Sequence, residues 1–202
     1  MSFRTENKFI LPKKKLFEFK HWLNQNSYSI LFEKRHINSI YFDTKNFMIY
    51  KDSVEGTTPR KKIRIRTYSE FFFDKNNKFN LEIKISSTEG RYKQTKKINN
   101  GINTFLIGYH DNQYGICFPV LNVSYKREYF VRDNSRITID TNIKYSSING
   151  RVKSNYCYYE DKYVVENKLT NNDKNEMLEF FPFSQTRFSK YCNGIEKVYS
   201  EI

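Results

Sequence analysis

The residues of this sequence best suited to chemistry are cations and carboxylates spaced two positions apart. In the stretch Arg60–Arg66, the cations Lys62, Arg64 and Arg66 alternate with two isoleucines. A period of two is typical of a β-strand, so the three cations share one strand face. Such a row of like charges is favoured where a polyanion lies against it. For this strand alone, a solvated face of an amphipathic sheet is the simpler interpretation.

Five further segments carry paired ionised residues two or four positions apart, a spacing that places both on one strand face. They are Glu6/Lys8, Glu82/Lys84, Arg91/Lys93, Arg136/Asp140 and Glu166/Lys168. Arginine and lysine neutralise phosphate oxygens, arginine through two-point contacts. Carboxylates bind hard divalent cations through oxygen. Together these patterns predict a site for a phosphate chain and a divalent cation. Phosphoryl transfer requires positioning and charge stabilisation rather than a covalent nucleophile, and no Ser–His pair is evident.

About eight strands, mostly antiparallel, must position these side chains. We expect them at 3–11, 36–43, 60–66, 79–86, 91–97, 123–132, 136–140 and 162–169, with residues 99–119 as a long connection. Helices are expected after Pro12, after Asp173 and after Ser189. The absence of repeats and linkers favours one domain over residues 1–202, of the α+β class.

Two architectures fit strands that are charged on one face and apolar on the other. In a sandwich, the apolar faces meet in a core and the charges face water. In an inverted barrel, the charges line the inside and helices cover the apolar outside. Pattern alone favours the sandwich, although a wide lumen would let ligand and water solvate the inward charges.

The composition narrows the partners of the protein. The 202 residues include 35 Lys and Arg against 22 Asp and Glu, a net charge of +13, which predicts an anionic partner. The basic helix at 13–20 has no base-reading pattern, so we expect no nucleic acid. No apolar run approaches the roughly 20 residues of a membrane helix, so any membrane association would come through a partner protein. The cysteines are odd in number and lack metal-binding spacing, so we interpret them as reduced thiols. Together with the absence of a signal peptide, this predicts a cytoplasmic location.

An ordered set of short motifs resembles one known family. The motifs are Arg4-x-Glu6-x-Lys8, IYFDT (40–44), KIRIR (62–66), LEIK (81–84), Arg91-Tyr92-Lys93, YKREYF (125–130), RITID (136–140), VENKL (165–169) and SKY (189–191). Together they resemble the VTC domain, the polyphosphate polymerase catalytic domain of the vacuolar transporter chaperone complex. That domain belongs to the triphosphate tunnel metalloenzymes and is related to the CYTH phosphatases.

The resemblance implies a fold and an activity. The fold would be a closed eight-stranded antiparallel β tunnel with helices packed outside. The activity would be that of a metal-dependent phosphotransferase that moves the γ-phosphoryl group of ATP onto a growing polyphosphate chain, with Mn²⁺ or Mg²⁺. Arg4 stands where CYTH phosphatases have a second glutamate, which favours the polymerase branch. A triphosphate hydrolase of the CYTH type and a non-catalytic polyphosphate-binding module are the alternatives.

The resemblance also assigns roles by position. The residues that would act on the phosphates in catalysis are Lys8, Arg64, Arg66, Lys84, Lys93, Arg127, Arg136 and Lys190. Substrate binding would fall to Lys62, Tyr125, Lys168 and Ser189, with Tyr125 stacked on the nucleotide base. Glu166 would hold the metal.

Overall fold

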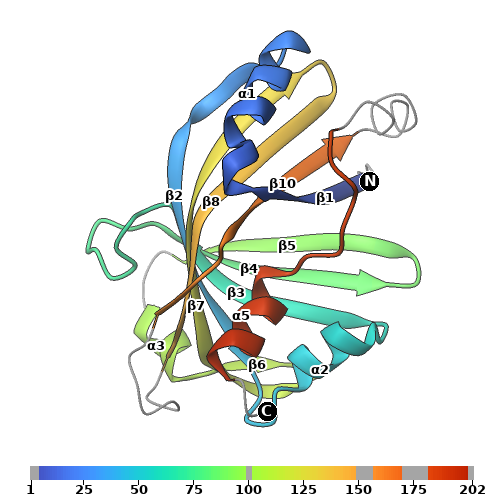
Figure 1. The fold of residues 1–202 in the computed structure, drawn as a ribbon. Helices are drawn as coiled ribbons and strands as arrows, with labels where there is room; N and C mark the ends of the chain where they lie inside the picture. The colour runs from blue at the N-terminus through green and yellow to red at the C-terminus, as the bar shows by residue number, and fades with distance from the viewer. Residues whose placement is uncertain (1–4, 99–101, 149–156, 170–181, 200–202) are drawn as a thin grey trace. The chain divides into compact units, whose positions relative to one another are not determined.

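A computed structural model describes residues 5–98, 102–148, 157–169 and 182–199 (Figure 1). The helix expected after Asp173 lies outside these ranges, as does Arg4. The strands are β1 Thr5–Pro12, β2 Ser29–Asp43, β3 Arg60–Thr67, β4 Phe79–Ser87, β5 Gly90–Ile98, β6 Tyr109–Asp111, β7 Gly115–Arg132, β8 Ser135–Ser147, β9 Cys157–Tyr159 and β10 Lys162–Leu169. The helices are the 3-10 turn Lys13–Lys15, α1 Leu16–Gln25, α2 Met48–Glu55, α3 Ile102–Ile107 and α5 Lys190–Val198.

The α+β class and the antiparallel pairing are confirmed, but the closed eight-stranded tunnel is wrong. The sheet has ten strands in the order β1-β10-β8-β7-β2-β3-β4-β5, with β6 and β9 paired to β7 and β8. Among the described residues no pairing joins β1 to β5, so the sheet is open. The two unexpected strands, β6 and β9, have three residues each, too few to establish a period of two.

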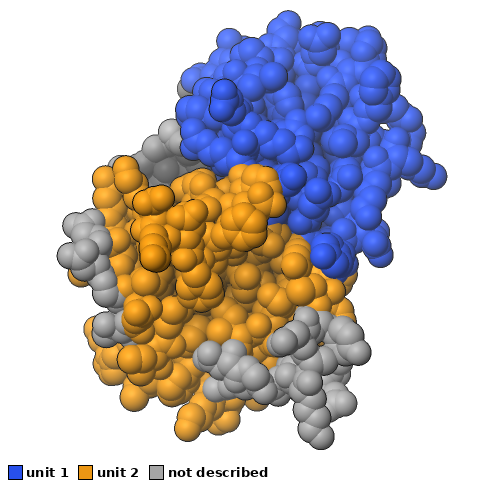
Figure 2. Space-filling view, turned by 90° about the vertical axis from the view of Figure 1, so that its left-hand side faces the viewer, with its two compact units in different colours: residues 1–35, 125–143, 159–188 blue, residues 36–124, 144–158, 189–202 orange. Residues whose placement is uncertain are grey.

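The chain forms two compact units, coloured separately in Figure 2. Unit 1 contains residues 1–35, 125–143 and 159–188, and unit 2 contains residues 36–124, 144–158 and 189–202. Strands β2, β7 and β8 each contribute residues to both units. The expectation of a single domain over residues 1–202 stays a prediction.

In unit 1 a helix covers the apolar face of the strands. Phe9 of β1 and Val165 of β10 pack in one core cluster with Phe19 and Leu23 of α1. The apolar stripe of α1 therefore faces the strands, as its spacing predicts. The neighbouring residues in the strands, such as Lys8 and Glu166, point to the opposite face by alternation. Within this unit the apolar face meets a helix, as in the inverted arrangement, and not a second sheet.

In unit 2 the strands β2, β3, β4 and β5 pair in sequence order, and α5 packs against their charged side. The register aligns Ile40, Ile65 and Leu81 in one apolar row across three strands. On the other face, the ring of Tyr191 in α5 stacks on the ring of Tyr41 in β2, with centroids 5.1 Å apart. Helix α5 begins at Ser189, whose hydroxyl accepts a hydrogen bond from the Cys192 backbone N–H.

Candidate functional site

One face of the unit 2 sheet gathers predicted phosphate-binding residues. The register pairs Lys62 of β3 with Lys84 of β4, and Lys84 with Lys93 of β5. We call these three residues the lysine row. Like charges directly opposite one another on adjacent strands are destabilising. The alignment therefore adds repulsion to the folded protein, and the pairing of Lys93 with Glu82 at 3.0 Å offsets part of it.

The next row of the same face holds a carboxylate among cations. Arg64 pairs with Glu82 across the strands, and its Nη2 lies 2.6 Å from Glu82 Oε2. Lys93 Nζ lies 3.0 Å from Glu82 Oε1, and Arg66 Nη1 lies 3.7 Å from Oε2. Burial would raise the pKa of Glu82, but Arg64, Arg66 and Lys93 outweigh it and lower the pKa to about 2. Glu82 is therefore ionised at neutral pH and holds cations from two neighbouring strands in place.

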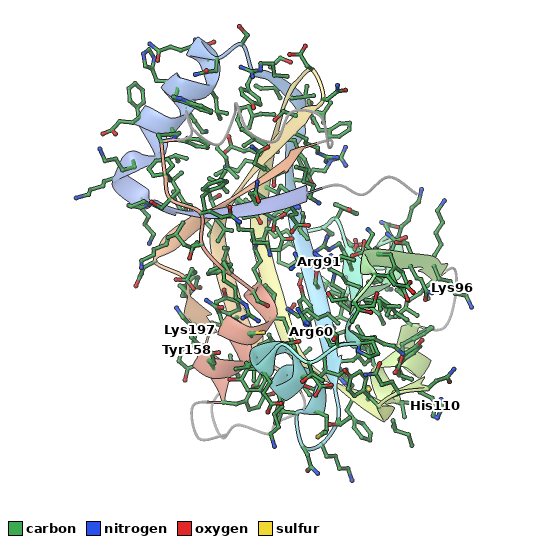
Figure 3. All side chains as sticks on the ribbon, turned by 90° about the vertical axis from the view of Figure 1, so that its right-hand side faces the viewer. Arg60, Arg91, Lys96, His110, Tyr158 and Lys197 are labelled. Carbon is green, nitrogen blue, oxygen red and sulfur yellow. The ribbon has the colours of Figure 1, made fainter. Side chains whose placement is uncertain are left out.

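Further residues extend this charged surface. The two rows described above, Lys62, Arg64, Arg66, Lys84, Lys93 and Glu82, are called the basic face of unit 2, and the further residues lie beside them. Arg91 of the edge strand β5 pairs with Ser86, which in turn pairs with Arg60. Both arginines are labelled in Figure 3. Lys97 aligns through Asn80 with Arg66. Cations thus outnumber carboxylates on this face as a whole, and the arrangement suits a polyanion with several phosphate groups.

Helix α5 brings the two predicted residues of its first turn to the basic face. Lys62 Nζ donates a hydrogen bond to Ser189 Oγ at 2.8 Å. Arg64 Nη1 donates one to the Tyr41 hydroxyl at 2.8 Å. Burial would raise the pKa of Tyr41, yet the charges of Arg64, Arg66 and Lys190 lower it overall. The charge of Lys190 therefore acts on the same face as those of the strand cations.

A second cluster lies on the charged face of unit 1. Arg127 donates two hydrogen bonds to Asp140, at 2.5 and 2.6 Å, and a third to Glu166 Oε2 at 3.2 Å. Burial would lower the pKa of the Arg127 guanidinium, but Asp140, Tyr125 and Glu166 raise it well above its ordinary value. Lys8 Nζ lies 3.9 Å from Glu166 Oε1. Positive and negative charges are close to balance here, unlike on the basic face of unit 2.

The other predicted residues of unit 1 occupy the same face. Lys168 pairs with Arg136 across the strands, and its Nζ lies 3.8 Å from Glu6 Oε2. The Arg136 guanidinium lies 5.1 Å from the centroid of the Tyr129 ring. The ring of Tyr125 is buried, with the Arg127 guanidinium 5.3 Å from its centroid. Tyr125 therefore packs against a cation in this structure, and its contact with a nucleotide base stays a prediction.

The donor set of unit 1 can be tested against Mn²⁺ or Mg²⁺. The described residues include no group of three or more His, Cys, Asp or Glu side chains able to hold a metal ion. Asp140 is occupied by two guanidinium hydrogen bonds, whereas Glu166 accepts one at 3.2 Å and faces Lys8 at 3.9 Å. Mg²⁺ commonly takes one or two carboxylates and draws its other ligands from phosphates and water. Glu166 fits a metal that arrives with phosphate and does not fit a closed protein metal site.

Three contributors to these clusters, Tyr41, Glu82 and Asp140, were not among the residues given a role from the sequence. Tyr41 lies in the IYFDT motif, and Glu82 lies in the LEIK motif on the predicted strand face of Lys84. Asp140 shares the predicted strand face of Arg136. The contact between Asp140 and Arg127 became evident only with the pairing of β7 and β8 in the structure. Strand alternation was the available signal for all three.

Comparison with known proteins identifies the family. The family model of the VTC domain matches residues 3–115 and 112–199. The chain therefore belongs to the VTC domain family. No curated protein sequence matches it.

Two solved structures share the fold at low sequence identity. A Vibrio parahaemolyticus protein provisionally assigned as an adenylate cyclase superposes with a TM-score of 0.51 and 14% identity, over 86% of this chain and 79% of that chain. A chain of the Schizosaccharomyces pombe Mediator head module superposes with a TM-score of 0.54 and 10% identity, over 85% of this chain and 84% of that chain. At these identities the likeness concerns the fold alone.

The structure also bears on membrane insertion. Within the described ranges, no helix combines the length and the apolar character needed to cross a bilayer.

Proposed function

We propose that this protein is a polyphosphate polymerase, which transfers the γ-phosphoryl group of ATP onto a growing chain of inorganic polyphosphate. Membership of the VTC domain family supports a phosphotransfer role. The observation that carries the proposal is the lysine row, in which Lys62, Lys84 and Lys93 are aligned across three strands. An extended polyanion would neutralise the aligned ammonium groups along its length.

The chemistry assigned to the basic face is charge stabilisation. A terminal phosphate oxygen of the chain attacks the γ-phosphorus of ATP, the bond from that phosphorus to the β–γ bridging oxygen breaks, and ADP leaves with the electron pair. Negative charge spreads over the transferred group and the leaving oxygen during this step. Arg64 and Arg66, fixed by Glu82, are preorganised donors for that charge. Lys84, Lys93 and Lys190 would neutralise the adjoining phosphates.

In unit 1, Glu166 would hold Mn²⁺ or Mg²⁺, which when bound would neutralise phosphate oxygens as a Lewis acid. Lys8 and Arg127 flank this carboxylate at 3.9 and 3.2 Å and keep it oriented. The substrates we propose are ATP and polyphosphate, without nucleic acid. A membrane-bound partner protein is the route we propose for any association with a membrane.

The test is to incubate the purified protein with ATP and Mn²⁺ and to analyse the products by gel electrophoresis and by a free-phosphate assay. Long phosphate chains on the gel are the expected result. Free phosphate without chains would identify a triphosphate hydrolase instead. If neither chains nor free phosphate form, the protein is a non-catalytic polyphosphate-binding module. Lys93→Ala should lower product formation, whereas Lys96→Ala is the matched control, because Lys96 lies on the opposite face of β5.

A further inference from the structure

A buried carboxylate at the end of β2 joins two helices of unit 2. Asp43 is fully buried, and its Oδ1 accepts hydrogen bonds from the backbone N–H groups of Thr44 at 2.7 Å and Ile49 at 2.9 Å. Its Oδ2 accepts from the backbone N–H of Tyr50 at 3.0 Å and from the hydroxyl of Tyr191. Asp43 thus satisfies the first turn of α2 and also binds the first turn of α5.

Tyr191 lies between the predicted phosphate ligands of α5 and those of the strands. It follows Lys190 directly, and its ring stacks on Tyr41, whose hydroxyl accepts a hydrogen bond from Arg64. Lys62 Nζ lies 5.9 Å from the centroid of the same ring. One side chain therefore contacts or adjoins several members of the basic face.

We propose that Asp43 and Tyr191 are positioning residues that fix the first turn of α5, and with it Ser189 and Lys190, on the basic face of unit 2. The inference rests on the proposed function of that face. Stacking of Tyr191 on Tyr41 is an apolar contact that tolerates sliding and rotation, and a phenylalanine would supply it equally well. The hydrogen bond to Asp43 adds direction, because it is satisfied only at one orientation of the helix.

The energetic cost of this contact supports a positioning role. Burial, together with the nearby charge of Asp43, raises the pKa of Tyr191 well above its ordinary value. The hydroxyl therefore stays protonated and donates a hydrogen bond to Asp43. Burial likewise raises the pKa of Asp43, against the effect of its hydrogen-bond donors. Burying a carboxylate and a phenol where a phenylalanine would pack is unfavourable unless both are paired. The pairing ties the helix that carries Lys190 to the sheet.

The test compares Tyr191→Phe with a matched variant, Tyr114→Phe. The Tyr114 hydroxyl donates to Asp52 Oδ2 at 2.7 Å, so this control also removes a phenol–carboxylate hydrogen bond within unit 2, but from α2 rather than α5. Both variants should melt at somewhat lower temperatures than the wild type. Only Tyr191→Phe should weaken tripolyphosphate binding in calorimetry, by about tenfold, the equivalent of one hydrogen bond. Equal affinity of Tyr191→Phe and wild type, or an equal loss in Tyr114→Phe, would overturn the proposal.

A double-mutant cycle then asks whether Tyr191 acts through Lys190. In a Lys190→Ala background, Tyr191→Phe should have much less effect on tripolyphosphate affinity than in the wild type, because the positioned cation is gone. An undiminished loss would contradict positioning of Lys190.

A readout that needs no ligand separates failure of this proposal from failure of the proposed function. Hydrogen exchange of the Asn193 amide, which donates to the Ser189 carbonyl at 2.9 Å, should accelerate in Tyr191→Phe and stay unchanged in Tyr114→Phe. Unchanged exchange in both variants would count against the positioning role. If wild-type protein fails to bind tripolyphosphate, the proposed function is wrong, and the exchange rates still decide whether Tyr191 holds α5.

Discussion

Arg127 and Asp140 form a two-point ion pair in unit 1, with Nε–Oδ1 at 2.5 Å and Nη2–Oδ2 at 2.6 Å. Asp140 is fully buried and the Arg127 side chain is only 11% exposed. The same guanidinium also reaches Glu166. Arg127, a predicted phosphate ligand, is therefore held by two carboxylates, and its orientation is fixed before any ligand binds.

The first prediction removes the charge of this pair. Asp140→Asn should destabilise the protein by about 3–5 kcal/mol, because it leaves a buried guanidinium without its main counter-charge. Urea denaturation measures the change, and Lys15→Ala is the control. Lys15 pairs with Glu18 at an exposed site, where a loss of at most about 1 kcal/mol is expected. A loss in Asp140→Asn no larger than in Lys15→Ala would show that the pair contributes little to stability.

The second prediction concerns the lysine row. Lys84→Ala should raise the free energy of unfolding of the ligand-free protein by about 0.5 kcal/mol, since it separates Lys62 from Lys93. The same substitution should weaken tripolyphosphate binding. Denaturation and calorimetry together test the opposite signs, with Lys96→Ala as the control on the other face of the edge strand. A destabilised Lys84→Ala variant would mean that the row is not under repulsion.

The third prediction concerns Glu82, whose roles in the empty and the bound protein differ. Glu82→Gln leaves Arg64, Arg66 and Lys93 without their common counter-charge, so the ligand-free protein should lose about 3 kcal/mol of stability at neutral pH. Binding of tripolyphosphate should tighten, because a negative charge has been removed from the basic face. Calorimetry that shows weaker binding would mean that the orientation of Arg64 and Arg66 by Glu82 matters more for the ligand than the negative charge of Glu82.

Glu82 also predicts a pH dependence. Its pKa in the folded protein is about 2, below the ordinary value of 4.5. Its contribution to stability is therefore complete above pH 4.5 and is lost as the pH falls towards 2. The gap in stability between wild type and Glu82→Gln should narrow over this interval. Denaturation curves at a series of pH values measure the gap, and a constant gap would contradict the assigned pKa.

The fourth prediction concerns the close packing of α5. A Cβ atom at Gly194 would lie 2.6 Å from Leu121 Cδ2 and 2.7 Å from Tyr145 Cδ1, and both neighbours are fully buried. Gly194→Ala should therefore destabilise the protein by about 1–3 kcal/mol, although alanine is normally the better helix residue. Thermal melting tests the change, with Glu196→Ala on the same helix as the control. A stabilised Gly194→Ala variant would show that the neighbours can move aside.

The fifth prediction separates a metal ligand from a structural ion pair at Glu166. Glu166→Gln keeps the shape of the side chain and loses its charge. As a metal ligand, its loss should abolish conversion of ATP in Mn²⁺ and leave metal-free binding of tripolyphosphate intact or tighter. As a partner of Arg127 alone, its loss should lower the melting temperature and spare turnover. Wild-type turnover with the same metal dependence would remove Glu166 from the metal site.

Local patterns in the sequence predicted the strands that alternate clearly. Ile63 and Ile65 mark one face of β3, and the structure buries both completely. The helix expected after Pro12 is α1, and the i, i+3, i+7 spacing of Leu16, Phe19 and Leu23 is typical of its apolar stripe. These signals depend only on which residues must face the core, and the sequence carries that information directly.

Features that depend on distant pairing could not be predicted. Strand β7 is an example: its first half contains Pro119 and several consecutive buried residues, which obscure any alternation. Asp43 resembles a turn former, and its partner Tyr191 is 148 positions away. Closure of a sheet depends on strand tilt and stagger, which no single strand encodes.

The lysine row has a consequence for the lifetime of the protein. If polyphosphate neutralises Lys62, Lys84 and Lys93, the bound form is more stable than the empty one by an amount that grows with ligand concentration, about 2.7 kcal/mol at one hundred times the dissociation constant. Proteases degrade the transiently unfolded fraction, which shrinks accordingly. Under the proposed function, cells rich in polyphosphate would retain this protein longer than starved cells, without any dedicated regulator.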